Sequence, residues 1–208
     1  MTVIDNVQGF TSDPQGVGND HLARVFILAG KIASQDMAKG IFSSVKVQAT
    51  GDSVIFTGCD TYRLVEITVD MPQVGEWLVY PNGKELAKAA SMVKGQSHVI
   101  FMADSDGKVT VSSNKGSVNI TGFGVNNTYA NVALLFDYAK YPDKWPVASV
   151  KFNGDLLGET MTLISDLVDY KGKGATGGGV TIDRLLPHIS MTAEREGISV
   201  RAILMPTR

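Results

Sequence analysis

The hydrophobic pattern of the chain switches several times between a helical period and a strand period. Residues 1 to 19 predict a short strand at 3–7 and a loop. Asn19 or Asp20 can then cap a helix through a side-chain oxygen, and the apolar residues that follow recur at helical spacing up to Ala33. Alternating apolar and polar residues predict the next strands, at 42–49, 54–56 and 65–69. The first unit is therefore a helix followed by antiparallel strands.

A second stretch repeats this order. A strand at 77–80 leads into a helix that runs to about Lys94. The helix carries an apolar stripe on one face and lysines on the other. Turn-forming residues separate the strands that follow, which are predicted at 99–103, 109–113 and 118–123. The pattern therefore predicts an internal duplication, with halves at 20–72 and 76–123.

A third unit begins after the break at Trp145-Pro146. A strand at 150–152 precedes a helix that Asn153 or Asp155 caps, with an apolar stripe up to Leu167. A glycine-rich loop follows, and then come strands around 180–182, 189–193 and 198–204. Only one helix-plus-strands unit is predicted in this part of the chain.

Two stretches of this pattern suggest a binding site. Residues 57–64 contain the turn formers Gly58, Asp60 and Thr61 and predict a tight corner between two strands. The last strand keeps its apolar pattern almost to Arg208, whereas most termini fray and are polar. We expect a docked tail that forms a small apolar cleft with the corner. The residues of this cleft are Met205 and Pro206 beside Leu64 and Tyr62, with Arg63 and Arg208 at the rim. The simpler alternative is a hairpin with a surface arginine.

Composition narrows the class of protein. The 208 residues are 44% hydrophobic and 19% charged, which is ordinary for a globular chain. The net charge of −2 gives no global signal for nucleic acid, although a local basic face can coexist with an acidic exterior. The single cysteine, Cys59, excludes an internal disulfide and a multi-cysteine metal site and suits a reducing cytoplasm. We expect a cytoplasmic protein, because the sequence shows neither a secretory signal nor an apolar run of about 18 residues.

Three motifs resemble those of the bacterial DNA polymerase III β sliding clamp. The corner resembles that family's Ala-Thr-Asp-Gly-(His or Tyr)-Arg-Leu motif, and the tail resembles its terminal Met-Pro-(Met or Val)-Arg. Residues 137–146 resemble its Gly-Arg-Phe-Pro-Asp-Tyr linker. The resemblance implies an α+β DNA-clamp fold with sheets outside and helices inside. It also implies a complete clamp-like domain at 1–146 and a shortened second domain at 147–208.

The resemblance implies a DNA polymerase processivity factor that encircles duplex DNA without reading its sequence and tethers a polymerase through a peptide pocket. By motif position the pocket residues are Thr61, Tyr62, Arg63, Leu64, Pro142, Leu204, Met205, Pro206 and Arg208. Thr61 stands where the family has Gly, and Cys59 where it has Thr, which could reshape the pocket. The alternative is that these are ordinary core and edge residues. If the pocket assignment holds, replacing Leu64 and Met205 by Asp should abolish peptide capture and leave folding largely intact.

The resemblance also implies partners and an assembly. The partners are DNA polymerase and other proteins with clamp-binding peptides, with a clamp loader as a further candidate. The shortened chain suggests a phage-like origin and a homo-oligomeric ring, with a trimer as the natural guess. No cofactor or metal is expected.

Cations on the polar faces of the first two helices would contact phosphates in such a ring: Arg24, Lys31, Lys84 and Lys88. A solvated helix face is the alternative. The third helix is acidic instead, because its polar face carries Glu159, Thr162 and Asp166. Either that helix does not line a hole, or nearby cations compensate, namely Lys171, Lys173 and Arg184.

Two other functions stay open. A non-encircling module could bind the same peptides and regulate replication, and a hydrolase or nuclease could use the same β-rich scaffold. We expect no enzyme, because the three histidines fall on different elements and Cys59 has no nearby histidine. The glycine-rich stretch 172–177 lacks the Gly-Lys-(Ser or Thr) order that cradles phosphate.

Overall fold

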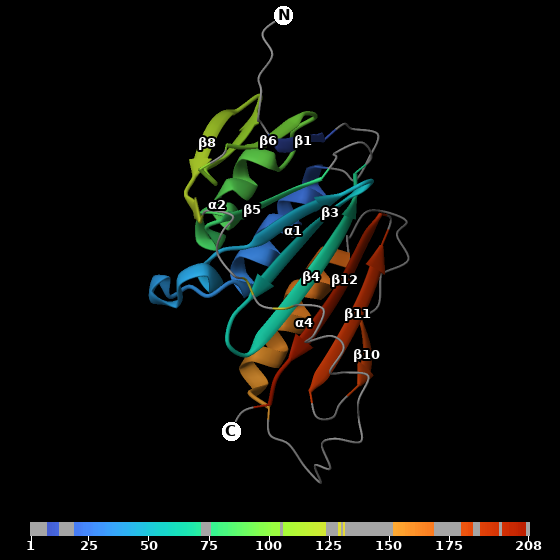
Figure 1. Cartoon of the computed structure of the whole chain (residues 1–208). Coiled ribbons are helices and arrows are strands. Elements are labelled where there is room, and N and C mark those ends of the chain that lie inside the picture. The colour runs from blue at the N-terminus through green and yellow to red at the C-terminus, as the bar shows by residue number, and fades with distance from the viewer. Residues whose placement is uncertain are drawn as a thin grey trace, which may run out of the picture.

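The structure is a computed structural model that describes residues 8–12, 19–71, 76–104, 106–123, 129, 131, 152–168, 180–184, 188–195 and 197–206. It confirms the α+β class, with helices packed against antiparallel sheets (Figure 1). The first unit contains α1 (Asn19–Ile32), β2 (Lys46–Thr50), β3 (Ser53–Cys59) and β4 (Arg63–Asp70). The second contains β5 (Trp77–Pro81), α2 (Gly83–Val93), β6 (Val99–Ala103), β7 (Val109–Ser113), β8 (Gly116–Ile120) and β9 (Gly122–Phe123).

The first two units exchange strands. β1 (Gln8–Ser12), which precedes α1, pairs with β6 of the second unit in a four-stranded sheet of order β1-β6-β7-β8. β5, which precedes α2, pairs with β2 of the first unit. Each unit therefore completes the sheet of the other, and the two helices pack against each other.

The third unit extends the first one. It contains α4 (Gly154–Val168), β10 (Thr181–Arg184), β11 (Ile189–Arg195) and β12 (Ile198–Leu204). β12 pairs antiparallel with β4, so that the larger sheet has the order β10-β11-β12-β4-β3-β2-β5-β9. In Figure 1, α1 and α4 lie behind this sheet, and α4 packs on β11 and β12 as well as on α1.

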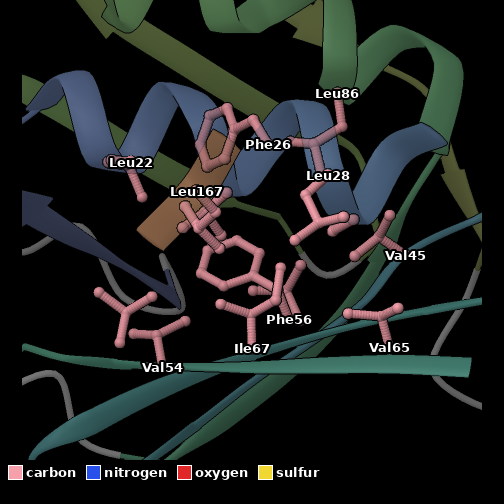
Figure 2. Close-up of a cluster of buried hydrophobic side chains, with 14 of the residues drawn as sticks. Leu22, Phe26, Leu28, Val45, Val54, Phe56, Val65, Ile67, Leu86 and Leu167 are labelled. Atoms are coloured by element: carbon pink, nitrogen blue, oxygen red, sulfur yellow. The ribbon is translucent and has the colours of Figure 1, made fainter. Parts of the chain in front are cut away.

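The core lies between the helices and the two sheets. Phe26 of α1 packs against Phe56 of β3 and Phe101 of β6, at ring-centroid distances of 5.8 and 6.1 Å. Figure 2 shows Leu22 and Phe26 at α1 on one side of the cluster and Val54, Ile67 and Val65 at the strands on the other. Each helix adds an apolar face to the same cluster, so one continuous core joins all three units.

The structure departs from the sequence predictions at element ends. Residues 8–12 form β1 where a loop was expected, and β2 starts at Lys46 because residues 37–43 form a 3₁₀ helix, η1. The strand expected at 118–123 is divided between β8 and β9. The strand expected at 3–7 lies outside the described residues, as does the boundary at 146 between the two expected domains. Within the described residues, no helix is long and apolar enough to cross a membrane.

Candidate functional site

The corner at residues 57–64 is held in shape by Asp60. Its Oδ1 accepts hydrogen bonds from the backbone N–H groups of Tyr62 and Arg63, at 2.7 and 2.6 Å. Its Oδ2 accepts one from Nε of Arg63 at 3.0 Å. An aspartate that binds the backbone two and three residues ahead stabilises a tight turn. The corner is therefore rigid where it presents Tyr62 to solvent.

The chain's tail lies beside this corner. β12 and β4 pair so that Leu204 faces Arg63 across the ladder and Ile203 faces Leu64. The N–H of Met205 continues the ladder by donating to the carbonyl oxygen of Tyr62 at 2.8 Å. The structure thus brings together the corner and the tail, which are far apart in sequence.

Alternation along the two strands assigns their side chains to two faces of the sheet. Val65 and Ala202 belong to the core that the helices cover, so Leu64 and Ile203 point to the opposite face, which we call the outer face. Tyr62 and Met205 continue the outer-face alternation and are 48% and 41% exposed. They are two of the large apolar side chains that the described residues leave exposed.

A second cluster of apolar side chains covers the outer face behind the corner. It contains Cys59, Leu64, Tyr80 and Tyr129, with Phe42 packed against them. The Tyr129 ring stacks on Tyr80 at 5.8 Å, and its hydroxyl lies 3.3 and 3.1 Å from the carbonyl oxygens of Ser44 and Thr57. Sequence reasoning missed Tyr129, because no local pattern connects it to strands more than 70 residues away.

The thiol of Cys59 is buried. Burial, with a smaller contribution from Asp60, raises its pKa from 9.0 to about 12. The thiol donates a hydrogen bond to the carbonyl oxygen of Asp60 at 3.1 Å. A thiolate is the reactive form, so this residue serves packing.

The rim expected at Arg63 needs a correction. Arg63 faces the helices, is 7% exposed, and binds both Asp60 and Glu159 of α4, the latter at 2.7 Å. Its guanidinium fixes the corner to α4 and is not presented beside Leu64. On the outer face of the same junction lies Arg201, which pairs with Glu66 at 2.6 Å and has a half-exposed side chain. The sequence contained a signal for it, because Arg201 alternates with Ala202 on the last strand.

The remaining pocket predictions have different placements. Leu204 is 1% exposed and belongs to the core beneath the sheet, so it supports the site from the inner face. Leu64 is 4% exposed, which corrects the expectation that an Asp there would leave folding intact. Thr61 is exposed, and Pro206 is partly exposed. Pro142 and Arg208 lie outside the described residues.

The expected cations on the helices fall into two groups. Lys31, Lys84 and Lys88 are exposed. Arg24 is partly buried, and its Nη1 donates to the backbone carbonyl oxygen of Asp166, so this arginine connects α1 to α4. A cavity of about 460 Å³ between these two helices is lined in part by Arg24, Lys31 and Lys94.

The exposed face of α4 is acidic, as expected. Asp155, Glu159 and Asp166 are exposed, and the helix contains no basic residue. Of the cations expected to compensate, Lys171 and Lys173 lie outside the described residues, and the side chain of Arg184 is not described. The helix layer is therefore basic on α1 and α2 and acidic on α4.

Metal ligands and histidines were the remaining candidates for chemistry in the described part of the chain. It contains no group of three or more His, Cys, Asp or Glu side chains placed to hold a metal ion. His188 is buried beside β11, while His98 is exposed in the turn before β6.

Comparisons with known proteins agree on the fold. No family model matches the sequence, and no curated protein matches it. The structure of a putative DNA polymerase III β subunit from Eubacterium rectale matches with a TM-score of 0.55 and 8% identity, over 99% of this chain and 52% of that one. The chain thus spans about half the length of that protein.

Two further structures are similar over the full chain. The DNA polymerase III β subunit of Thermotoga maritima has a TM-score of 0.56 and 11% identity, with 67% of its own length covered. The pol III β of Caulobacter crescentus has a TM-score of 0.55 and 11% identity, with 68% covered. The chain has the α+β fold of the bacterial DNA polymerase III β sliding clamps, as the three sequence motifs implied.

Proposed function

We propose that the protein is a clamp-like processivity factor, which encircles duplex DNA as a homo-oligomer and holds a polymerase through a peptide site on the outer face. The site consists of the exposed side chains of Tyr62 and Met205, with the buried Leu64 and Ile203 beneath them and Arg201 at its edge. The fold supports this function, since the solved structures that share it include sliding clamps such as that of Bacillus subtilis.

The observation that carries the proposal is the junction between corner and tail. Tyr62 and Met205 are exposed on a rigid frame, because Asp60 fixes the corner and a backbone hydrogen bond fixes the tail. An aromatic ring beside a flexible thioether can accept varied apolar side chains. A short peptide with an apolar tip therefore fits this surface.

Peptide binding tests the site directly. The probe is a synthetic octapeptide that ends in Leu-Phe, and its control carries Ser at both positions. Met205→Asp should raise the Kd for the probe at least about tenfold, which corresponds to about 1.4 kcal/mol. Ser199→Asp is the matched control, because Ser199 is exposed on the same strand and the same face but near the other end. Equal affinities for the two variants would reject the site.

DNA binding would use the exposed lysines of α1 and α2. Gly30 near the end of α1 contacts Gly83 at the start of α2. Lys31 directly follows the first of these glycines and Lys84 the second, so the backbones of the two lysines lie near each other. Such cations bind phosphates without reading bases.

The second candidate is a module that binds the same peptides without encircling DNA. The acidic face of α4 favours it, since Asp155, Glu159 and Asp166 would repel phosphates. Retention on circular DNA distinguishes the two functions.

A further inference from the structure

Arginines from three other elements bind α4, and two of them bind its C-terminal end. Arg24 of α1 donates a hydrogen bond to the backbone carbonyl oxygen of Asp166. Arg195, the last residue of β11, donates to that of Val168 at 2.8 Å. Carbonyl oxygens in the last turn of a helix have no partner within the helix, and a cation there also interacts favourably with the helix dipole. These two contacts therefore fix the C-terminal end of α4 to α1 and to the sheet.

The N-terminal half of α4 packs less tightly. The apolar residues in the second half of the helix are buried: Leu163, Ile164, Leu167 and Val168. Those in the first half are only partly buried: Leu156, Leu157 and Met161. The third arginine, Arg63 of β4, binds this half through the side chain of Glu159. The ion pair between Arg63 and Glu159 therefore connects the more loosely packed half of α4 to the sheet.

Arg63 extends this connection to the corner that presents Tyr62. Its Nη1 donates to Oε2 of Glu159 at 2.7 Å, and its Nε donates to Oδ2 of Asp60 at 3.0 Å. The other carboxylate oxygen of Asp60 accepts from the backbone N–H of Tyr62 at 2.7 Å. One guanidinium thus binds two carboxylates at once, which the ammonium of a lysine cannot reproduce with the same geometry. We call Asp60, Arg63 and Glu159 the Arg63 bridge.

The Arg63 bridge has a buried centre and two exposed ends. The side chain of Arg63 is 8% exposed, whereas that of Glu159 is 49% exposed on the helix layer. Tyr62, at the other end, is 48% exposed on the outer face. Hydrogen bonds between charged groups are stronger where water is excluded. The centre therefore holds a fixed geometry between two surfaces that ligands can reach.

We propose that the Arg63 bridge couples the peptide site to α4, and that Glu159 is a positioning residue for that site. The coupling rests on the proposed function, since it acts on the same peptide site. Tyr62 loses less conformational freedom on binding a peptide when Asp60 and Arg63 already hold the corner, and such preorganisation raises affinity. Glu159 contributes by holding the guanidinium in the orientation that also binds Asp60.

The coupling gives the exposed face of α4 a regulatory role. A cationic partner that pairs with Glu159 competes with Arg63 for the carboxylate, which loosens the corner and weakens peptide binding. Coupling between two sites is reciprocal. A bound peptide that fixes Tyr62 therefore also orders the first half of α4.

Asp155 offers a matched control on the same helix. It lies four residues before Glu159, so the two carboxylates share one exposed face of α4. Arg63 forms its ion pairs with Asp60 and Glu159. Asp155→Asn and Glu159→Gln each remove one negative charge from this face, but only the second change reaches the Arg63 bridge.

The first measurement is the Kd of the Leu-Phe octapeptide. Glu159→Gln should raise it by about threefold, since an exposed ion pair contributes little, and Arg63→Lys should raise it at least about fivefold. The double variant should bind like Arg63→Lys alone, because both changes break the same connection. Asp155→Asn should bind like wild type. Multiplied effects in the double variant, or equal effects of Asp155→Asn and Glu159→Gln, would overturn the proposal. Urea midpoints confirm that each variant is folded, and Glu159→Gln carries the test if Arg63→Lys folds poorly.

The second measurement is amide hydrogen exchange without peptide, which separates the coupling from the proposed function. In Glu159→Gln, the N–H groups of Tyr62 and Arg63 should exchange at least about twofold faster than in wild type, and in Asp155→Asn they should not change. Equal rates in Glu159→Gln and wild type would contradict the role of Glu159. If wild type binds no octapeptide, the proposed function fails, and the exchange rates alone decide whether Glu159 positions the corner.

Discussion

Two arginines form ion pairs across the same junction but on opposite faces of the sheet. Arg63 on β4 reaches under the sheet to Glu159 of α4 at 2.7 Å, with an 8% exposed side chain. Arg201 on β12 reaches Glu66 of β4 at 2.6 Å on the outer face, with a 50% exposed side chain. The distances are nearly equal, so burial is the main difference between the two pairs.

This difference in burial gives Arg63 a structural role and leaves Arg201 available for binding. A buried charge that loses its partner is strongly destabilising, whereas an exposed pair contributes little. Arg63 therefore connects the corner to α4, and Arg201 can exchange partners in water. The inner face fixes the junction, and the outer face is available to a ligand.

The largest predicted effect concerns Arg63. Arg63→Met leaves the mostly buried carboxylate of Asp60 without its cation and should lower the free energy of unfolding by about 3 kcal/mol. Arg201→Met is the matched control on the same junction, and it should lower it by less than about 1 kcal/mol. Urea denaturation of the two variants checks this. Equal losses would remove the distinction between the two faces.

The outer cluster should make the protein sensitive to alkali. The folded-state pKa of Cys59, about 12, exceeds its unfolded value of 9.0, so above pH 9 the unfolded chain binds fewer protons than the folded one. Stability that is complete below pH 9 is then lost as pH rises toward 12, by up to about 1.4 kcal/mol per pH unit. Cys59→Ala should flatten this dependence, as urea midpoints between pH 8 and pH 11 would show. An identical slope for the variant would mean that the thiol titrates normally.

Tyr129 gives a smaller test of the same cluster. Tyr129→Phe keeps the ring against Tyr80 but removes the hydroxyl that bonds to two backbone carbonyl oxygens. The loss should be about 1 kcal/mol. Thermal unfolding compared with wild type measures it, and an unchanged melting temperature would show that water replaces the hydroxyl without loss.

The smallest effect is expected at Glu159. Its side chain is 49% exposed, and Arg63 keeps Asp60 as a partner when Glu159 changes. Glu159→Gln should therefore lower stability by less than about 1 kcal/mol. A loss as large as that of Arg63→Met would place the main stabilisation on α4 and not on the corner.

Much of the fold could be predicted from the sequence, because the helical and the strand spacing of apolar residues are both local patterns. The strands at 99–103, 109–113 and 198–204 coincide with the structure. The strand at 8–12 escaped prediction, since it is stabilised by pairing with β6, and its own residues, Gln-Gly-Phe-Thr-Ser, show no strong alternation. Strand exchange depends on partners that are distant in sequence, so no window of residues reveals it.

The candidate site was predictable in position but not in orientation. The motifs placed the corner and the tail together, and the ladder between β4 and β12 joins them. The face on which Arg63 lies depends on the register of that ladder, and a shift of one residue would exchange the faces. The sequence does not reveal the register between β4 and β12. Once the register is known, Arg63 and Leu204 are assigned to the buried face.

Retention on circular DNA tests the central claim most directly. The protein is incubated with a nicked circular plasmid, washed at high salt, and then compared with a sample in which the plasmid has been linearised. High salt weakens phosphate contacts, so only a closed ring stays on the circle, and it should slide off once the plasmid is cut. Equal loss from circular and linear DNA would contradict a clamp and leave a peptide-binding module.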